Sequence, residues 1–156
     1  MPNILIPTIV RSFHNIFTSV WVGGMLALVL SVMPSIRKEI KDPGMQGKVI
    51  DQVLIRQSRW VYFGIIVLFA SGVLMTRLSG QSNGLLNFTN TYTTVLSIKH
   101  ILVILMAMIA VIRSTVFRKA ASSMNKGKKK ASMALLMINT LIGLAVLVLS
   151  SVNAIL

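Results

Sequence analysis

The stretch that decides the fold is residues 8–33, TIVRSFHNIFTSVWVGGMLALVLSVM, in which only Arg11 and His14 can carry a charge. A membrane-spanning helix needs roughly 20 predominantly apolar residues, so this stretch is long enough to cross a bilayer. Lipid offers no hydrogen-bond partners to backbone groups, so the stretch must be helical. Pro34 comes directly after it and predicts the end of the first helix.

Three further stretches have the same character, at about residues 60–78, 95–112 and 131–155. Together with the first, they predict an all-α fold, an integral membrane four-helix bundle that forms one transmembrane domain over residues 1–156. The composition agrees, because 12% of the residues are charged, against roughly 25% in soluble domains. Between the first two spans, Asp-Pro-Gly-Met-Gln-Gly at 42–47 predicts a turn. Residues 48–59 predict an amphipathic helical lead-in to the second span.

The basic residues predict the orientation of the bundle. Thirteen of the sixteen Lys and Arg lie in the connections 37–59 and 113–130. The positive-inside rule places these loops in the cytoplasm, and both termini and the uncharged connection 79–94 outside. We therefore expect a multi-pass protein of the cell membrane, in contact with the lipid bilayer. The net charge of +13 then reflects topology, and we expect no nucleic-acid partner.

Several classes of chemistry are excluded by residues that the chain lacks. It has no cysteine, so disulfides and thiolate sites are impossible. The three acids, Glu39, Asp42 and Asp51, all lie in the first basic loop. The spans therefore lack the carboxylates used in proton-coupled transport and acid–base hydrolysis. No P-loop, His-Glu-x-x-His or Gly-x-Ser-x-Gly pattern occurs, and we expect no catalytic activity from this chain on its own.

The two histidines of the chain, His14 and His100, both lie within predicted spans. The first and third helices enter from the same side, so the two residues share one depth, roughly 7–9 Å below the outer boundary at 1.5 Å per residue. An ionisable residue inside a membrane helix indicates a site. Imidazole is a common ligand of haem iron, copper and zinc. The pair is therefore predicted to bind a metal, and two facing imidazoles suit a six-coordinate haem b in a bundle core.

The remaining cations of the chain lie near this predicted site. Arg11, Arg77 and Lys99 are the only Lys and Arg outside the two basic loops. They would suit the propionates of a haem, as charge-assisted hydrogen-bond donors. Snorkelling to lipid head groups explains Arg11 and Arg77 equally well, and Lys99 less well.

Three other side chains complete the predicted site. Thr18 and Trp21 continue the stripe of His14 along the first helix. Thr18 would contribute a hydroxyl, and Trp21 would line a flat ring or simply pack. Met75 lies at a similar depth on the second helix, and its thioether suits Cu(I), so it is a ligand in the copper alternative.

Short motifs along the chain resemble the copper-resistance protein D family. They are His14–Pro34, with Trp-x-Gly-Gly at its centre, Arg56–Arg59 followed by Ser71-Gly72, and Ser97–His100. The resemblance implies a membrane bundle that handles copper or haem. A related haem-binding membrane family, which includes a protoporphyrinogen oxidase, shares the His and Lys pattern in four-helix form. Full copper-resistance proteins of this kind are longer and richer in Met and His, so this chain resembles the four-helix core alone.

Three functions are expected on these grounds. The first is a haem b protein that transfers electrons at the outer leaflet, with His14 and His100 as axial ligands and Arg11, Arg77 and Lys99 on the propionates. The second is copper binding or transport through the same histidines and Met75. The third is a cofactor-free accessory subunit of a larger membrane complex. An electron carrier needs a membrane redox partner, and a homo-oligomer is compatible with each function.

The orientation is testable on this cysteine-free chain. Single cysteines placed at Ser82 and Ser123 should react differently with an impermeant thiol reagent in intact cells, because only the first lies in the connection expected outside. We expect labelling at 82 and none at 123 until the cells are permeabilised. Labelling at 123 alone would invert the topology and move both histidines to the inner leaflet.

Overall fold

The computed structural model describes residues 5–78, 86–117 and 126–155. Their helices are α1 (Leu5–Ala27), α2 (Met33–Glu39), α3 (Pro43–Leu78), α4 (Thr91–Ile112) and α5 (Lys126–Ile155), with π-helical turns η1 (Leu28–Val32) and η2 (Arg113–Phe117). Four continuous helical segments are long and apolar enough to cross a membrane. This confirms the predicted all-α membrane bundle.

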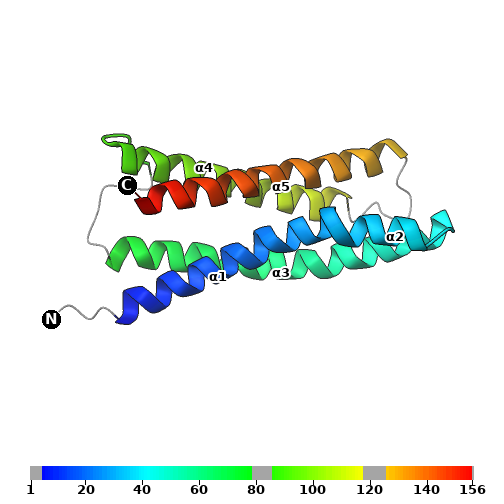
Figure 1. The fold of residues 1–156 in the computed structure, drawn as a ribbon, viewed down its shortest axis with the longest axis horizontal. Coiled ribbons are helices and arrows are strands. Elements are labelled where there is room, and N and C mark those ends of the chain that lie inside the picture. The colour runs from blue at the N-terminus through cyan, green and yellow to red at the C-terminus, as the bar shows by residue number, and fades with distance from the viewer. Residues whose placement is uncertain (1–4, 79–85, 118–125, 156) are drawn as a thin grey trace.

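The bundle consists of two helix pairs (Figure 1). Helix α3 packs along α1, and α5 packs along α4, while contacts between α3 and α4 are few. The rings of Phe17 and Phe63 meet edge to face within the first pair, with centroids 5.6 Å apart. Helices α1 and α4 begin at the same end of the bundle, as the expected topology requires (Figure 1).

Contacts between α1 and α5 join the two pairs. A Cβ atom added at Gly143 of α5 would lie 3.2 Å from Met106 Cε of α4 and 3.2 Å from Val22 Cγ1 of α1. Because lipid gives helices no hydrophobic reason to associate, such close approach at small residues supplies the packing energy. The buried core surrounds this crossing and includes Trp21, Val22, Met25, Met106, Leu136 and Val146.

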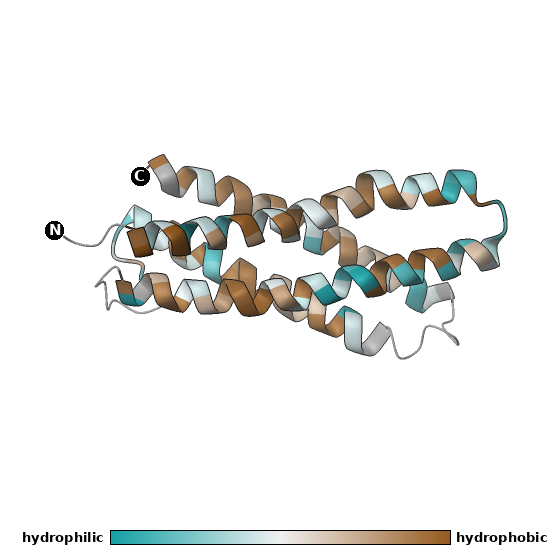
Figure 2. Cartoon of the chain, turned by 90° about the horizontal axis from the view of Figure 1, so that it is seen from below, coloured by the Kyte–Doolittle hydropathy of each residue, from teal (hydrophilic) through white to brown (hydrophobic). Residues whose placement is uncertain are grey.

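The helices consist mostly of hydrophobic residues (Figure 2), and many of their large apolar side chains are exposed on the outside of the bundle. Ile66, Phe69 and Leu141 are 66%, 73% and 65% exposed. In water so many large apolar side chains would mark an aggregation hazard, whereas in a bilayer they face acyl chains. Contact with the lipid bilayer follows from this surface.

The first helical segment does not end at Pro34, so that prediction was wrong. The helix runs through Pro34 to Glu39. Proline removes one backbone donor and crowds the preceding turn. Here the backbone widens into the π turn η1, and the N–H of Met33 bonds to the carbonyl of Leu28. The register shift just before the proline accommodates it without breaking the helix.

The predicted turn at 42–47 is also shorter than expected. The chain reverses at Ile40–Asp42, and the helix α3 already begins at Pro43. The Asp42 carboxylate accepts a hydrogen bond from the N–H of Met45, with an N–O distance of 2.7 Å. An aspartate N-cap followed by proline at the first helical position is a strong helix start. The predicted lead-in helix over 48–59 is confirmed as the first part of the continuous α3.

The crossing at Gly143 can be tested by overpacking. The Gly143→Leu variant should lose about 1–3 kcal/mol of stability, because added methylenes in a close-packed core force neighbours apart. The matched control is Gly23→Leu, because a Cβ at the exposed Gly23 meets nothing within 4 Å. Thermal unfolding in detergent, followed by circular dichroism, should show a lower midpoint for the first variant alone. Equal midpoints would refute the tight crossing.

Candidate metal site

His14 of α1 is held by a hydrogen bond to the neighbouring helix. Its Nδ1 lies 2.9 Å from Ser71 Oγ of α3. The Ser71 hydroxyl itself donates to the carbonyl of Leu68, at 3.1 Å. A hydroxyl has one proton, so Ser71 accepts from His14, and His14 carries its proton on Nδ1. The lone pair of His14 Nε2 is then available to a ligand.

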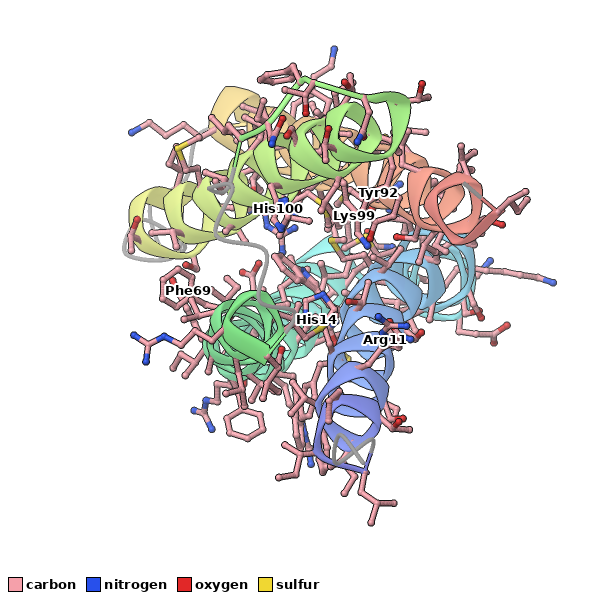
Figure 3. All side chains as sticks on the ribbon, turned by 90° about the vertical axis from the view of Figure 1, so that its left-hand side faces the viewer. Arg11, His14, Phe69, Tyr92, Lys99 and His100 are labelled. Atoms are coloured by element: carbon pink, nitrogen blue, oxygen red, sulfur yellow. The ribbon has the colours of Figure 1, made fainter. Side chains whose placement is uncertain are left out.

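His100 of α4 faces His14 across the bundle (Figure 3). The two are close enough for their charges to interact, and Lys99 acts on His14 in the same way. His100 Nδ1 is buried and has no hydrogen-bond partner among the described residues. A buried polar atom without a partner is costly and indicates that something else binds there.

The start of α4 is capped by hydrogen bonds, and this sets the position of His100 along the helix. Asn90 caps the helix and forms a reciprocal capping box with Thr93. One turn before His100 lies Ser97, whose Oγ accepts from the N–H of Asn87 and donates to its carbonyl, at 2.8 and 2.9 Å. His14 and His100 are each the tenth residue of their helix, about 14 Å along it at 1.5 Å per residue.

The three basic residues predicted around the site differ in their exposure. Lys99 is half-buried and lies beside the histidine pair, whereas Arg11 and Arg77 are exposed. Their exposure suits contact with head groups, which is the snorkelling alternative. The fold brings together His14, His100 and Lys99, and it leaves the two arginines on the surface of the bundle.

The other predicted site residues also differ in position. The Thr18 hydroxyl donates to the carbonyl of His14, at 2.8 Å, so its proton is used within α1. Trp21 is buried in the core and lines a cavity deeper in the bundle rather than the histidine pair. Met75 is half-buried, one helical turn beyond Ser71 on α3. Residues four apart share a helix face, so Met75 lies on the side of α3 that carries Ser71.

The donor set is small. Among the described residues, no three His, Cys, Asp or Glu side chains come together as a metal site. The available ligands are two imidazoles and, one turn beyond Ser71 on α3, one thioether. A site of this kind suits a soft ion of low coordination number. A haem would need a large cavity between the imidazoles, and the 440 Å³ cavity of the structure is not lined by either histidine.

Two residues of importance were missed by sequence reasoning. Ser71 was noted only as part of a motif, although a polar side chain in an apolar span is itself a signal for a buried hydrogen bond. Arg113 was assigned to a loop, but it lies in the helical turn η2, half-buried against the cavity. Asn139 bonds across helices, since its Nδ2 donates to Met25 Sδ at 3.4 Å.

Comparison with known proteins yields one match. The family model described as Copper resistance protein D matches residues 51–153. This range includes Ser71, Met75 and His100, and it excludes His14. No curated protein and no solved structure matches the chain.

Proposed function

The chain belongs to the copper resistance protein D family, and from that membership we propose that it binds copper within its membrane bundle, through His14 and His100. The observation that carries the proposal is the facing pair of imidazoles from two parallel helices, each at the same distance along its helix. The two imidazole rings are the expected source of the donor atoms.

Ser71 orients the first of these histidines. A metal-bound histidine usually donates its second ring N–H to a neighbouring group, which fixes the tautomer and the ring plane. The bond from His14 to Ser71 supplies this support. Because Ser71 is tied to its own helix, the ring is held relative to α3 as well as α1.

The expected oxidation state of the copper follows from the softness of its ligands and from the charges around the site. Two imidazoles with a nearby thioether suit Cu(I), which accepts low coordination numbers and soft ligands. No carboxylate of the chain lies in α1 or α4 near the histidines to balance a doubly charged ion. Lys99 beside the pair repels cations, and the repulsion is half as large for Cu(I) as for Cu(II).

Haem b is the second candidate, and Lys99 is the observation that favours it. A half-buried lysine next to two histidines would suit a propionate. The exposed Arg11 and Arg77 would then bind propionates only at the surface. The family match favours copper, and the position of the cavity away from the histidines agrees with a small ion.

The charge bias of the loops supports a position for the site near the outer face. Copper bound there would exchange with the outside of the cell rather than with the cytoplasm. A chain that binds neither copper nor haem would fit an accessory role in a larger membrane complex.

Copper binding is tested by metal titration of the purified chain. The wild-type protein should retain about one Cu(I) per chain through detergent exchange, and His14→Ala and His100→Ala should each lose most of the affinity, because one imidazole cannot hold the ion alone. Met75→Leu should weaken binding less, and the exposed Met108→Leu is its matched control. An absorption spectrum with the split bands of a low-spin haem, lost in both histidine variants, would overturn the copper proposal in favour of haem b.

The role of Ser71 is separable from that of the ligands. Ser71→Ala should weaken Cu(I) binding by about 10–100-fold, as loss of an outer-shell partner does. Ser150→Ala is the control, since its hydroxyl donates to the carbonyl of Val146 within α5. The readout is Cu(I) affinity by competition with a chromogenic chelator. Unchanged affinity in Ser71→Ala would show that the bond to His14 is structural only.

A further inference from the structure

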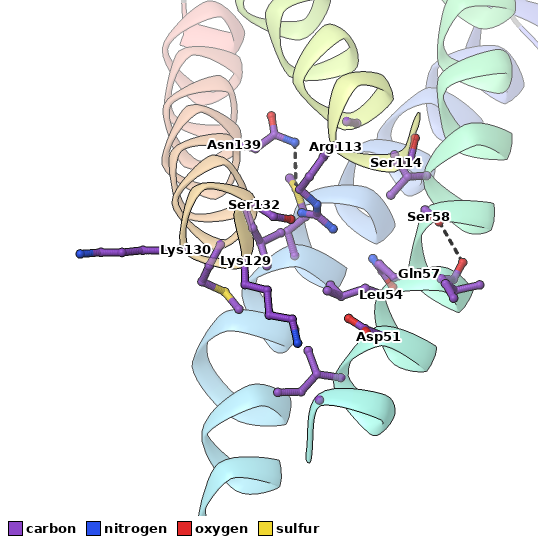
Figure 4. A pocket seen from close by; sticks show the side chains of 18 of the residues that line it. Asp51, Leu54, Gln57, Ser58, Arg113, Ser114, Lys129, Lys130, Ser132 and Asn139 are labelled. Atoms are coloured by element: carbon purple, nitrogen blue, oxygen red, sulfur yellow. Dashed lines mark hydrogen bonds between the residues drawn. The ribbon is translucent and has the colours of Figure 1, made fainter. Parts of the chain in front are cut away.

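A cavity, seen from close by in Figure 4, lies toward the end of the bundle opposite the starts of α1 and α4. It is a cavity of about 440 Å³ between α1, α3, α5 and the turn η2. That volume lies within the range of ligand sites in proteins, roughly 300–1,000 Å³. The cavity shares no residue with the proposed copper site.

The floor of the cavity is apolar but contains two buried polar atoms without partners. Trp21 Nε1 and Asn139 Oδ1 have no hydrogen-bond partner among the described residues. The two residues are only 4% and 2% exposed, and both line the cavity. One atom is a donor and the other an acceptor, so a ligand that satisfies both must itself contain an acceptor and a donor.

The mouth of the cavity is cationic. Arg113 and Lys129 extend into it from η2 and α5, while Lys130 points away (Figure 4). Lys129 reaches across to α3, because its Nζ would lie 3.8 Å from a Cβ added at Gly47. Asp51 is the single acid among the described lining residues, against Arg37, Arg113, Lys129 and Lys130.

The start of α5 adds to this positive potential. The helix begins at Lys126, and its first residues are Lys-Gly-Lys-Lys-Lys with no acid in the first turn. Free N–H groups and the helix dipole already make a helix start positive, so lysines there are unfavourable unless an anion is bound. A topology signal requires basic residues near the membrane, but it does not require them at a helix start above a cavity.

We infer that this cavity binds the head group of an anionic phospholipid with a hydroxylated head, such as phosphatidylglycerol. The phosphate lies between Arg113 and Lys129, and the polar atoms of the head group and glycerol pair with Trp21 Nε1 and Asn139 Oδ1. Basic pockets between helices near the membrane surface bind such head groups. The cavity is too small for whole acyl chains, which reach the bilayer along the sparsely packed line between α3 and α4.

The test uses Trp21 as a reporter in the full chain. A Trp60→Phe background leaves Trp21 as the single tryptophan. The protein is placed in nanodiscs of phosphatidylcholine with increasing fractions of brominated phosphatidylglycerol or brominated phosphatidylcholine, and quenching is recorded. Half-maximal quenching should need about fivefold less of the anionic lipid, which corresponds to ~1 kcal/mol for one basic residue.

The variants distinguish a specific lipid site from a general attraction of anionic lipid to basic residues. Arg113→Gln should abolish the preference, and Arg113→Lys should retain most of it. The control is Lys38→Gln, which removes an equal charge from an exposed residue of α2 that does not line the cavity. Circular dichroism and gel filtration confirm that each variant is folded.

Equal quenching by both lipids, or equal losses in Arg113→Gln and Lys38→Gln, would overturn the proposal. Relief of quenching by soluble glycerol phosphate would also overturn it, in favour of a soluble phosphate ester.

Discussion

Every polar group placed among these helices must find its partner inside the bundle, because the surrounding acyl chains offer none. Several polar side chains in the spans obey this constraint locally. Thr18, Thr140 and Ser150 each donate to the carbonyl four residues earlier in their own helix. Such bonds satisfy the hydroxyl and add nothing between helices. The bonds that do cross between helices therefore mark where the sequence departs from plain lipid-phase packing.

Few such crossings occur in the described residues, and they divide between the two ends of the bundle. At one end, Ser71 of α3 holds His14 of α1. At the other end, Tyr62 of α3 bonds to Ser114 of η2, and Asn139 of α5 bonds to Met25 of α1. The middle is closed by apolar packing around Gly143. A rigid apolar centre with a polar site at each end allows the two sites to differ in chemistry without sharing residues.

The unpartnered buried atoms follow the same division. His100 Nδ1 lies at the histidine end, and Trp21 Nε1 and Asn139 Oδ1 lie at the cavity end. Leaving a buried polar atom unpaired has a free-energy cost of roughly 1–3 kcal/mol. Bound ligands would offset this cost, a soft metal ion at the first end and an anionic head group at the second. Trp21 belongs to the second end, although its position two turns along from His14 suggested a role at the first.

The sequence by itself determined the number of membrane helices, their helical state and the similar position of the two histidines along their helices. These features depend on apolar length, on backbone hydrogen bonding and on counting residues along a helix, all of which are local properties. Helix ends were less well determined, since Pro34 continues a helix through a π turn and Asp42 starts one earlier than the turn residues suggested. Only the tertiary structure decided which helices pair, that Ser71 supports His14, and that Arg113 and Lys129 line one cavity. Those facts depend on how each helix is rotated about its axis. In a membrane that rotation is set by the fit of small and large side chains between helices. The hydropathy pattern does not encode this fit.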